Sequence, residues 1–162
     1  MRRIQGLFLL FLTVILLTGC GGDERPCADL LGDFCAQYGD LPSGQSYFAG
    51  AEEWEAGAMP PDMADILFTE DNGENAFSLC TDYAIFLSSS YGGGEIAFLR
   101  AEGRGDAARL AEMCASRLAR VTRALPDGEI GQGACVVQKG YTVVLLLLPD
   151  NGRAKEICRD LL

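Results

Sequence analysis

The sequence predicts an α+β domain with a mainly antiparallel sheet, helices packed on that sheet, and a short helical or irregular segment before it. Three observations predict this fold. Two strand-like segments precede a long amphipathic helix, a second pair of strand-like segments follows it, and an amphipathic segment comes last. The predicted order is β-β-α-β-β-α, with residues 27–162 forming a single domain.

The first part of the predicted domain has the weaker patterns. We expect Ala28–Tyr38 to form a short helix with its apolar residues on one side. Residues 39–58 are rich in Gly, Ser, Glu and Ala, which predicts a loop or irregular structure. A short helix is then expected from Pro60 through Phe68, because proline suits the first helical turn.

The strand predictions rest on aromatic and aliphatic segments. Tyr83–Ser88 and Ile96–Leu99 predict two strands joined by a Ser/Gly loop. Ala134–Gln138 and Tyr141–Leu148 predict a hairpin, after which Asp150-Asn151-Gly152 turns the chain into a final helix. The apolar side of that helix is predicted to contain Ala154, Ile157, Cys158 and Leu161.

The long helix is predicted to begin at a capping Asp106, to run to about Ala124 and to be ended by Pro126-Asp127-Gly128. Arg109, Arg120 and Arg123 occupy one face, which we expect to be solvated, as such stripes usually are. The opposite face is predicted to pack on the sheet and contains Ala107, Leu110, Ala111, Cys114, Leu118, Val121 and Leu125.

The last predicted strand is apolar on both faces, whereas a two-layer domain would leave one face polar and wet. The second face must therefore be covered by the N-terminal segment or by a partner chain. We favour the N-terminal segment, because it is apolar enough and already attached.

The first residues have the layout of a secretory signal. Arg2 and Arg3 precede an apolar stretch from Leu7 to Leu17, and small residues follow. This stretch is shorter than the roughly 20 apolar residues that span a bilayer. An uncleaved signal-anchor helix is the alternative that the sequence leaves open.

The residues Leu17, Thr18, Gly19 and Cys20 resemble the lipobox of bacterial lipoprotein precursors. The resemblance implies that Cys20 receives a diacylglycerol group and that the signal peptide, residues 1–19, is removed. Residues 20–26 would then be the lipidated cysteine and a short tether. We accordingly expect a chain anchored at the extracytoplasmic face of the cell membrane.

Composition excludes several classes of function. The net charge is −10, and a polyanion is repelled by nucleic acid and by anionic headgroups. We therefore expect no nucleic-acid partner and no membrane contact except the lipid. The sequence has no histidine, which excludes Ser-His-Asp and Cys-His catalysis and imidazole metal sites. No catalytic residue, metal site or cofactor is predicted.

Six cysteines remain besides Cys20, and they are predicted to be either disulfides or core thiols: Cys27, Cys35, Cys80, Cys114, Cys135 and Cys158. Their even number permits three disulfides, with a connectivity that the sequence leaves open. A helix at residues 28–38 would separate Cys27 and Cys35 by about 12 Å, so that helix and a bridge between them exclude each other. Cys114 and Cys158 are expected to be buried, since both lie on sheet-facing stripes.

Other polar groups predict no site. The turn that begins at Glu70 and includes Asp71, Asn72, Glu74 and Asn75 lacks the spacing of an EF-hand. Gly92-Gly93-Gly94 lacks the lysine of a phosphate-binding loop, and Ser88-Ser89-Ser90 lacks a base.

From about Ala64 to Leu162 the chain resembles a family of bacterial lipoproteins, domain of unknown function 4358, found mostly in Firmicutes. The segments that carry the resemblance are YAIFLSSS at Tyr83–Ser90, EIAFLRAEG at Glu95–Gly103 and ACVVQKGYTVVLLLLPD at Ala134–Asp150. The resemblance implies no activity. We expect a non-enzymatic envelope lipoprotein that acts through protein contacts. The alternatives are a small-molecule-binding lipoprotein and a thiol-based redox protein.

Overall fold

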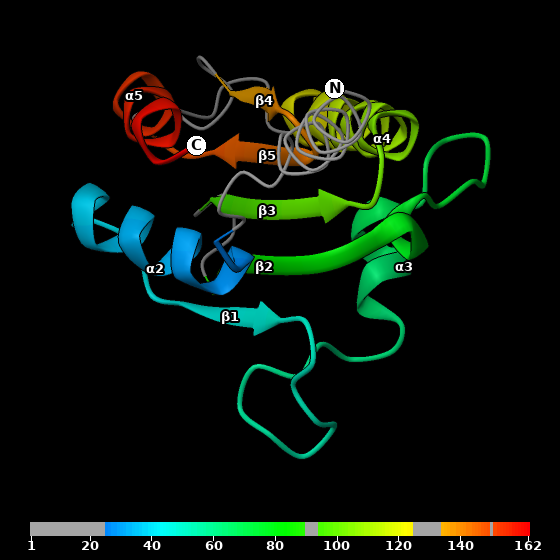
Figure 1. Cartoon of the computed structure of the whole chain (residues 1–162), viewed down its shortest axis with the longest axis horizontal. Coiled ribbons are helices and arrows are strands. Elements are labelled where there is room, and N and C mark those ends of the chain that lie inside the picture. The colour runs from blue at the N-terminus through cyan, green and yellow to red at the C-terminus, as the bar shows by residue number, and fades with distance from the viewer. Residues whose placement is uncertain (1–24, 90–93, 125–133, 150) are drawn as a thin grey trace, which may run out of the picture.

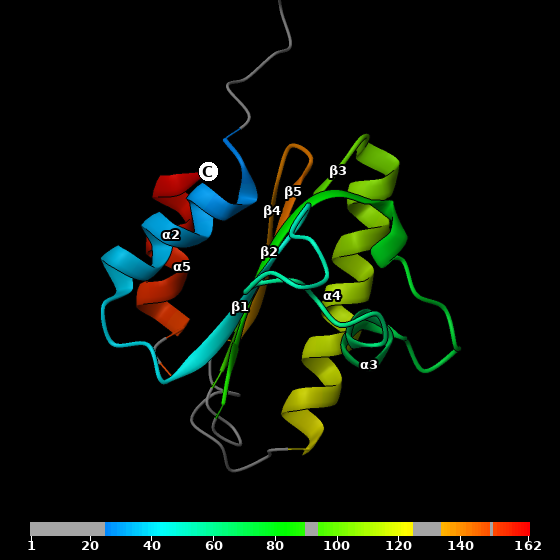
Figure 2. The same ribbon diagram turned by 90° about the horizontal axis from the view of Figure 1, so that it is seen from below.

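The computed structural model describes residues 25–89, 94–124, 134–149 and 151–162. A five-stranded sheet lies between two layers of helices, as the edge-on view in Figure 2 shows. Helices α2 (Cys27–Tyr38) and α5 (Asn151–Leu161) cover one face, and α3 (Met63–Phe68) and α4 (Arg104–Ala124) cover the other. The predicted α+β class, with helices packed on an antiparallel sheet, is confirmed.

Each strand is antiparallel to its neighbours, in the spatial order β1-β2-β3-β5-β4 (Figure 1). Helix α4 connects β3 to the β4–β5 hairpin. The pairing of β3 with β5 therefore joins the β2–β3 hairpin to the β4–β5 hairpin. The bounds are β1 Gly44–Phe48, β2 Cys80–Ser88, β3 Glu95–Ala101, β4 Cys135–Lys139 and β5 Thr142–Leu147, with a 3-10 helix η1 at Phe77–Leu79 before β2.

Strand β5 is buried on both faces, as its sequence requires. Val143 and Leu145 belong to the core beneath α4, whereas Val144 and Leu146 belong to the core beneath α2 and α5. Phe34 of α2 is fully buried in the second core and packs edge-on against Phe98 of β3. The prediction that the N-terminal segment covers the second face is therefore confirmed.

The register defines two ends of the sheet. At one end, which we call the Arg100 end, the paired residues are Asp82, Arg100, Thr142 and Lys139. At the other, the Glu95 end, Glu95 lies between Leu87 and Leu147. Helices α2 and α4 begin at the Arg100 end, and the final residue lies near that end as well (Figure 2).

The prediction of irregular structure over residues 39–58 is wrong for β1, a short edge strand. Its sequence, GQSYF, is half exposed and has little apolar alternation. Gly44 permits the pairing, because a Cβ there would lie 2.4 Å from the Leu87 carbonyl oxygen and 2.5 Å from the Phe86 ring. A larger residue would push β1 away from β2.

The long helix α4 differs from the prediction in its first residue and in the residues of its buried face. It begins at Arg104, before the expected cap Asp106, and Met113 joins its buried face. Ala107, Leu110 and Cys114 are fully buried as expected. The predicted stop at Pro126-Asp127-Gly128, together with Leu125, lies outside the described residues.

Candidate functional site

A polar cluster fixes the first described residues to the sheet. Asp82 Oδ2 accepts a hydrogen bond from the Cys27 backbone N–H at 2.7 Å, and Arg100 Nη1 lies 3.6 Å from the same oxygen. Arg100 Nη2 donates to the Arg25 carbonyl oxygen at 2.5 Å. The cluster therefore holds the chain from two sides at the N-terminus of α2, where an acceptor for a backbone N–H is favourable.

The Asp82–Arg100 cluster was not predicted from the sequence. Arg100 lies in the buried strand β3 and is 8% exposed, so its charge needs a local partner. A charged residue inside a buried strand was the available signal. The partners could not be found from the sequence, because 18 residues separate Asp82 from Arg100 and 75 separate Arg100 from Arg25.

The six cysteines outside the lipobox are free thiols in the structure. Cys27, Cys114 and Cys158 are buried, and Cys35, Cys80 and Cys135 are partly buried. The prediction of core burial is confirmed for Cys114 and Cys158. Cys27 and Cys35 lie at the first and ninth positions of α2, so the helix is confirmed and a bridge between them is excluded.

Burial raises the pKa of every one of these thiols. Desolvation is the largest cause for Cys80 and Cys158, whose pKa rises from 9.0 to about 12. The pKa of Cys27 and of Cys114 is raised further, again by desolvation first and then by the charge of Asp82 or Glu95. Thiols with a raised pKa are weak nucleophiles at neutral pH, because the thiolate is the reactive form.

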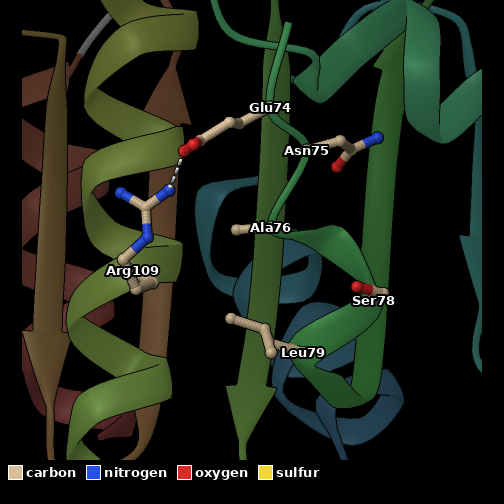
Figure 3. Close-up of a pocket in the computed structure, with 6 residues that line it drawn as sticks. All are labelled: Glu74, Asn75, Ala76, Ser78, Leu79 and Arg109. Carbon is tan, nitrogen blue, oxygen red and sulfur yellow. Dashed lines mark hydrogen bonds and ion pairs between the residues drawn. The ribbon is translucent and has the colours of Figure 1, made fainter.

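An open pocket of about 320 Å³ lies between α4 and the segment before β2. In Figure 3, Arg109 extends from α4 towards Glu74. Asn75, Ser78 and Leu79 line the pocket from the facing segment. Arg109 Nη2 lies 2.8 Å from Glu74 and 3.4 Å from Glu70, and its Nη1 donates to Glu112.

The charges around this pocket determine what it can attract. One guanidinium meets three carboxylates, so the local excess is negative and cations are favoured over anions. The hydrogen bond to Glu112 is the largest cause of a raised Arg109 pKa, which keeps the guanidinium charged. Within the described ranges, no three His, Cys, Asp or Glu side chains form a group that could hold a metal ion.

The expectation of a solvated arginine stripe on α4 is wrong for Arg120, whereas the Arg109 side chain is 41% exposed in spite of its ion pairs. Arg120 donates to the carbonyl oxygens of Leu67 and Thr69, which are left without helical partners at the C-terminus of α3. Arg123 is exposed. Two of the three arginines thus fasten the α3 region to α4.

A buried ion pair joins β3 to α4 at the Glu95 end. Glu95 is 4% exposed, and its Oε2 accepts hydrogen bonds from Arg117 Nε at 3.1 Å and Nη2 at 2.9 Å. The other oxygen, Oε1, is buried and has no hydrogen-bond partner among the described residues. The pair fixes the lateral position of α4. Its net contribution to the free energy of unfolding is small, because burying both charges carries a large desolvation cost.

The predicted lipobox Leu17, Thr18, Gly19 and Cys20 lies outside the described residues, as do the signal peptide, most of the tether, residues 90–93 and Asp150. Among the helices in the described part of the chain, none is both long enough and apolar enough to cross a membrane.

Comparisons of the chain with protein-family models, with curated proteins and with solved structures find no match. The resemblance to the bacterial lipoprotein family stays a prediction. The function must therefore be argued from this chain's own residues.

Proposed function

We propose that the chain is a lipoprotein anchored by Cys20 at the extracytoplasmic face of the cell membrane, and that its domain acts by binding an envelope protein rather than by catalysis. The observation that carries the proposal is the order of residues 1–20: two arginines, a short apolar stretch, and the sequence LTGC. The domain begins only a few residues later, as expected for a globular part carried next to its anchor.

Two exposed residues support a protein contact. Trp54 is 81% exposed and Ile66 is 62% exposed, and they are the large hydrophobic side chains that stand out from the described surface. Tryptophan is enriched at the energetic centres of protein interfaces. The lack of histidine and the raised thiol pKa values support a non-catalytic role over the redox alternative.

The anchor is tested by the intact mass of the protein extracted from membranes of a bacterium that expresses it. We expect a chain that begins at Cys20 and carries a diacylglycerol adduct. The matched variant Cys20→Ala should keep the uncleaved signal and lack the adduct. An unmodified wild-type mass that includes Met1 would overturn the anchor.

The partner contact is tested by placing a photo-crosslinking residue at position 54 in intact cells, with Glu53 as a neighbouring control position. We expect one discrete adduct from position 54 that is absent or much weaker from position 53. Turnover of a substrate by the purified protein, abolished by point substitutions, would overturn the non-catalytic role.

The pocket at Arg109 favours small-molecule binding as the second candidate function. Its volume of about 320 Å³ is at the lower end of the range for small-molecule sites. A cationic metabolite that binds only the folded state would raise the melting temperature of the protein. A Ser78→Trp substitution that fills the pocket should remove that shift.

A further inference from the structure

We infer that the Arg100 end of the sheet faces the lipid bilayer and that the Glu95 end points away from it. The inference rests on the proposed lipid anchor at Cys20. It assigns the surface of the domain that lies nearest the phospholipid headgroup layer, with the lipid on Cys20 as the attachment to the bilayer.

The first step is the place where the chain enters the domain. Arg25 is held at the Arg100 end, because its carbonyl oxygen accepts a hydrogen bond from Arg100 Nη2. The backbone of Cys27 is held there as well by Asp82. The entry point is therefore fixed to one end of the sheet by two contacts from adjacent strands.

The second step is the length of the tether. Cys20 and Arg25 are five positions apart, which limits their separation to about 18 Å when the chain is fully extended. A lipidated Cys20 thus keeps Arg25 close to the headgroups.

The sheet is longer than this tether can extend. Strand β2 advances roughly 20 Å from Asp82 to Ser88, at about 3.3 Å per residue. With the Glu95 end on the bilayer, Arg25 would lie about 20 Å from it, beyond the roughly 18 Å that even a fully extended tether spans. With the Arg100 end on the bilayer, no extension is required.

The register identifies what this surface presents. The β4–β5 turn at Lys139-Gly140 lies at the Arg100 end, because Lys139 and Thr142 pair there. The start of α4 at Arg104 also lies there, directly after β3. Ser89 follows the last residue of β2 and lies at the opposite end, where its N–H donates to the Ser43 carbonyl oxygen.

The single tryptophan permits a direct test. In a Trp54→Phe background, Lys139→Trp places a fluorophore at the Arg100 end and Ser89→Trp places one at the Glu95 end, both at exposed positions. The full lipidated proteins are reconstituted into phosphatidylcholine vesicles containing lipids with a nitroxide on the headgroup. Trp54→Phe alone measures the background.

We expect the nitroxide lipids to quench the Lys139→Trp protein several-fold more strongly than the Ser89→Trp protein. Inserting a long Gly/Ser linker after Gly22 should remove most of this difference, because the tether would no longer restrict the domain. Equal quenching at both positions with the natural tether, or stronger quenching at position 89, would overturn the orientation.

Flotation of the same vesicles separates this inference from the proposed function. Protein that floats and shows equal quenching retains the anchor and contradicts only the orientation. Protein that does not float, and lacks the adduct on Cys20, contradicts the anchor and the orientation together.

Discussion

Asp82 on β2 accepts the backbone N–H of Cys27, the first residue of α2, at 2.7 Å. This contact joins residues 55 positions apart and fixes the helix that covers the second face of the sheet. Arg100 shares the carboxylate, so the same side chain also neutralises a buried charge.

Asp82→Ala should destabilise the protein by about 1–3 kcal/mol, because the helix amide loses its acceptor and Arg100 loses its ionic partner. Urea unfolding followed by circular dichroism measures the change. Asp33→Ala is the matched control, since Asp33 contacts Arg25 at an exposed position where ion pairs contribute little. Equal stability of the two variants would contradict the role of Asp82.

Arg117→Met should be more damaging, because it leaves the Glu95 carboxylate buried without a cation. Breaking a buried pair in this way costs about 3–5 kcal/mol, and the partial exposure of Arg117 favours the lower part of that range. The double variant Glu95→Leu/Arg117→Met should recover most of the loss. A double variant that is as unstable as Arg117→Met alone would show that the pair is not the cause.

Arg120→Met should loosen α3 by removing the donors to the Leu67 and Thr69 carbonyl oxygens. Hydrogen bonds from a charged donor contribute about 1.5–3 kcal/mol each. Hydrogen exchange should accelerate over residues 63–69 while the sheet amides keep their protection. Arg123 is exposed on the same helix and supplies the control variant Arg123→Met. This variant should change neither the exchange over residues 63–69 nor the protection of the sheet amides.

Thiol labelling under native conditions should divide the cysteines by burial. We expect a maleimide to react first with the partly buried Cys35 and Cys135 and last with the buried Cys114. Unfolding in urea should make all the thiols react at similar rates. Fast native labelling of Cys114 would show that the core beneath α4 opens readily.

Stability should fall at alkaline pH. The thiol pKa of Cys158 is about 12 in the folded protein, against an ordinary value of 9.0. Between these values the unfolded chain has released a proton that the folded chain keeps, so rising pH favours unfolding. Each such thiol contributes a loss of up to about 1.4 kcal/mol per pH unit above pH 9.

The matched variant for this pH effect is Cys158→Ala, which removes one of these protons. Its free energy of unfolding should fall less steeply with pH than that of the wild-type protein. The difference between the two proteins should be constant below pH 8. Parallel curves from pH 8 to pH 11 would contradict the raised pKa of Cys158.

Much of the fold could be predicted because its elements carry local patterns. The aromatic and aliphatic runs at Tyr83–Ser88 and Tyr141–Leu148 predict strands, and the two apolar faces of β5 require a cover on each side. Strand β1 could not be predicted from its own residues. Its existence depends on the edge of β2 and on the space that Gly44 leaves for Phe86.

The polar sites were harder to predict because, like β1, they depend on contacts between residues that are distant in sequence. The Asp82–Arg100 cluster, the Glu95–Arg117 pair and the contacts of Arg120 join residues that are distant in sequence. A charged residue in a sequence carries no sign of its partner. Arg120 has the same helical periodicity as the exposed Arg123, and only the position of α3 distinguishes them.

The packing of α2 against α5 has a consequence for the order in which the protein is made. Leu30 and Leu31, near the start of the domain, share one core with Ile157 and Cys158, near its end. Since synthesis runs from the N-terminus, that core cannot close until the ribosome has passed residue 161 and the last helix is free. Until then α2 has no partner for its apolar face, so we expect incomplete chains to aggregate more readily than the full-length protein.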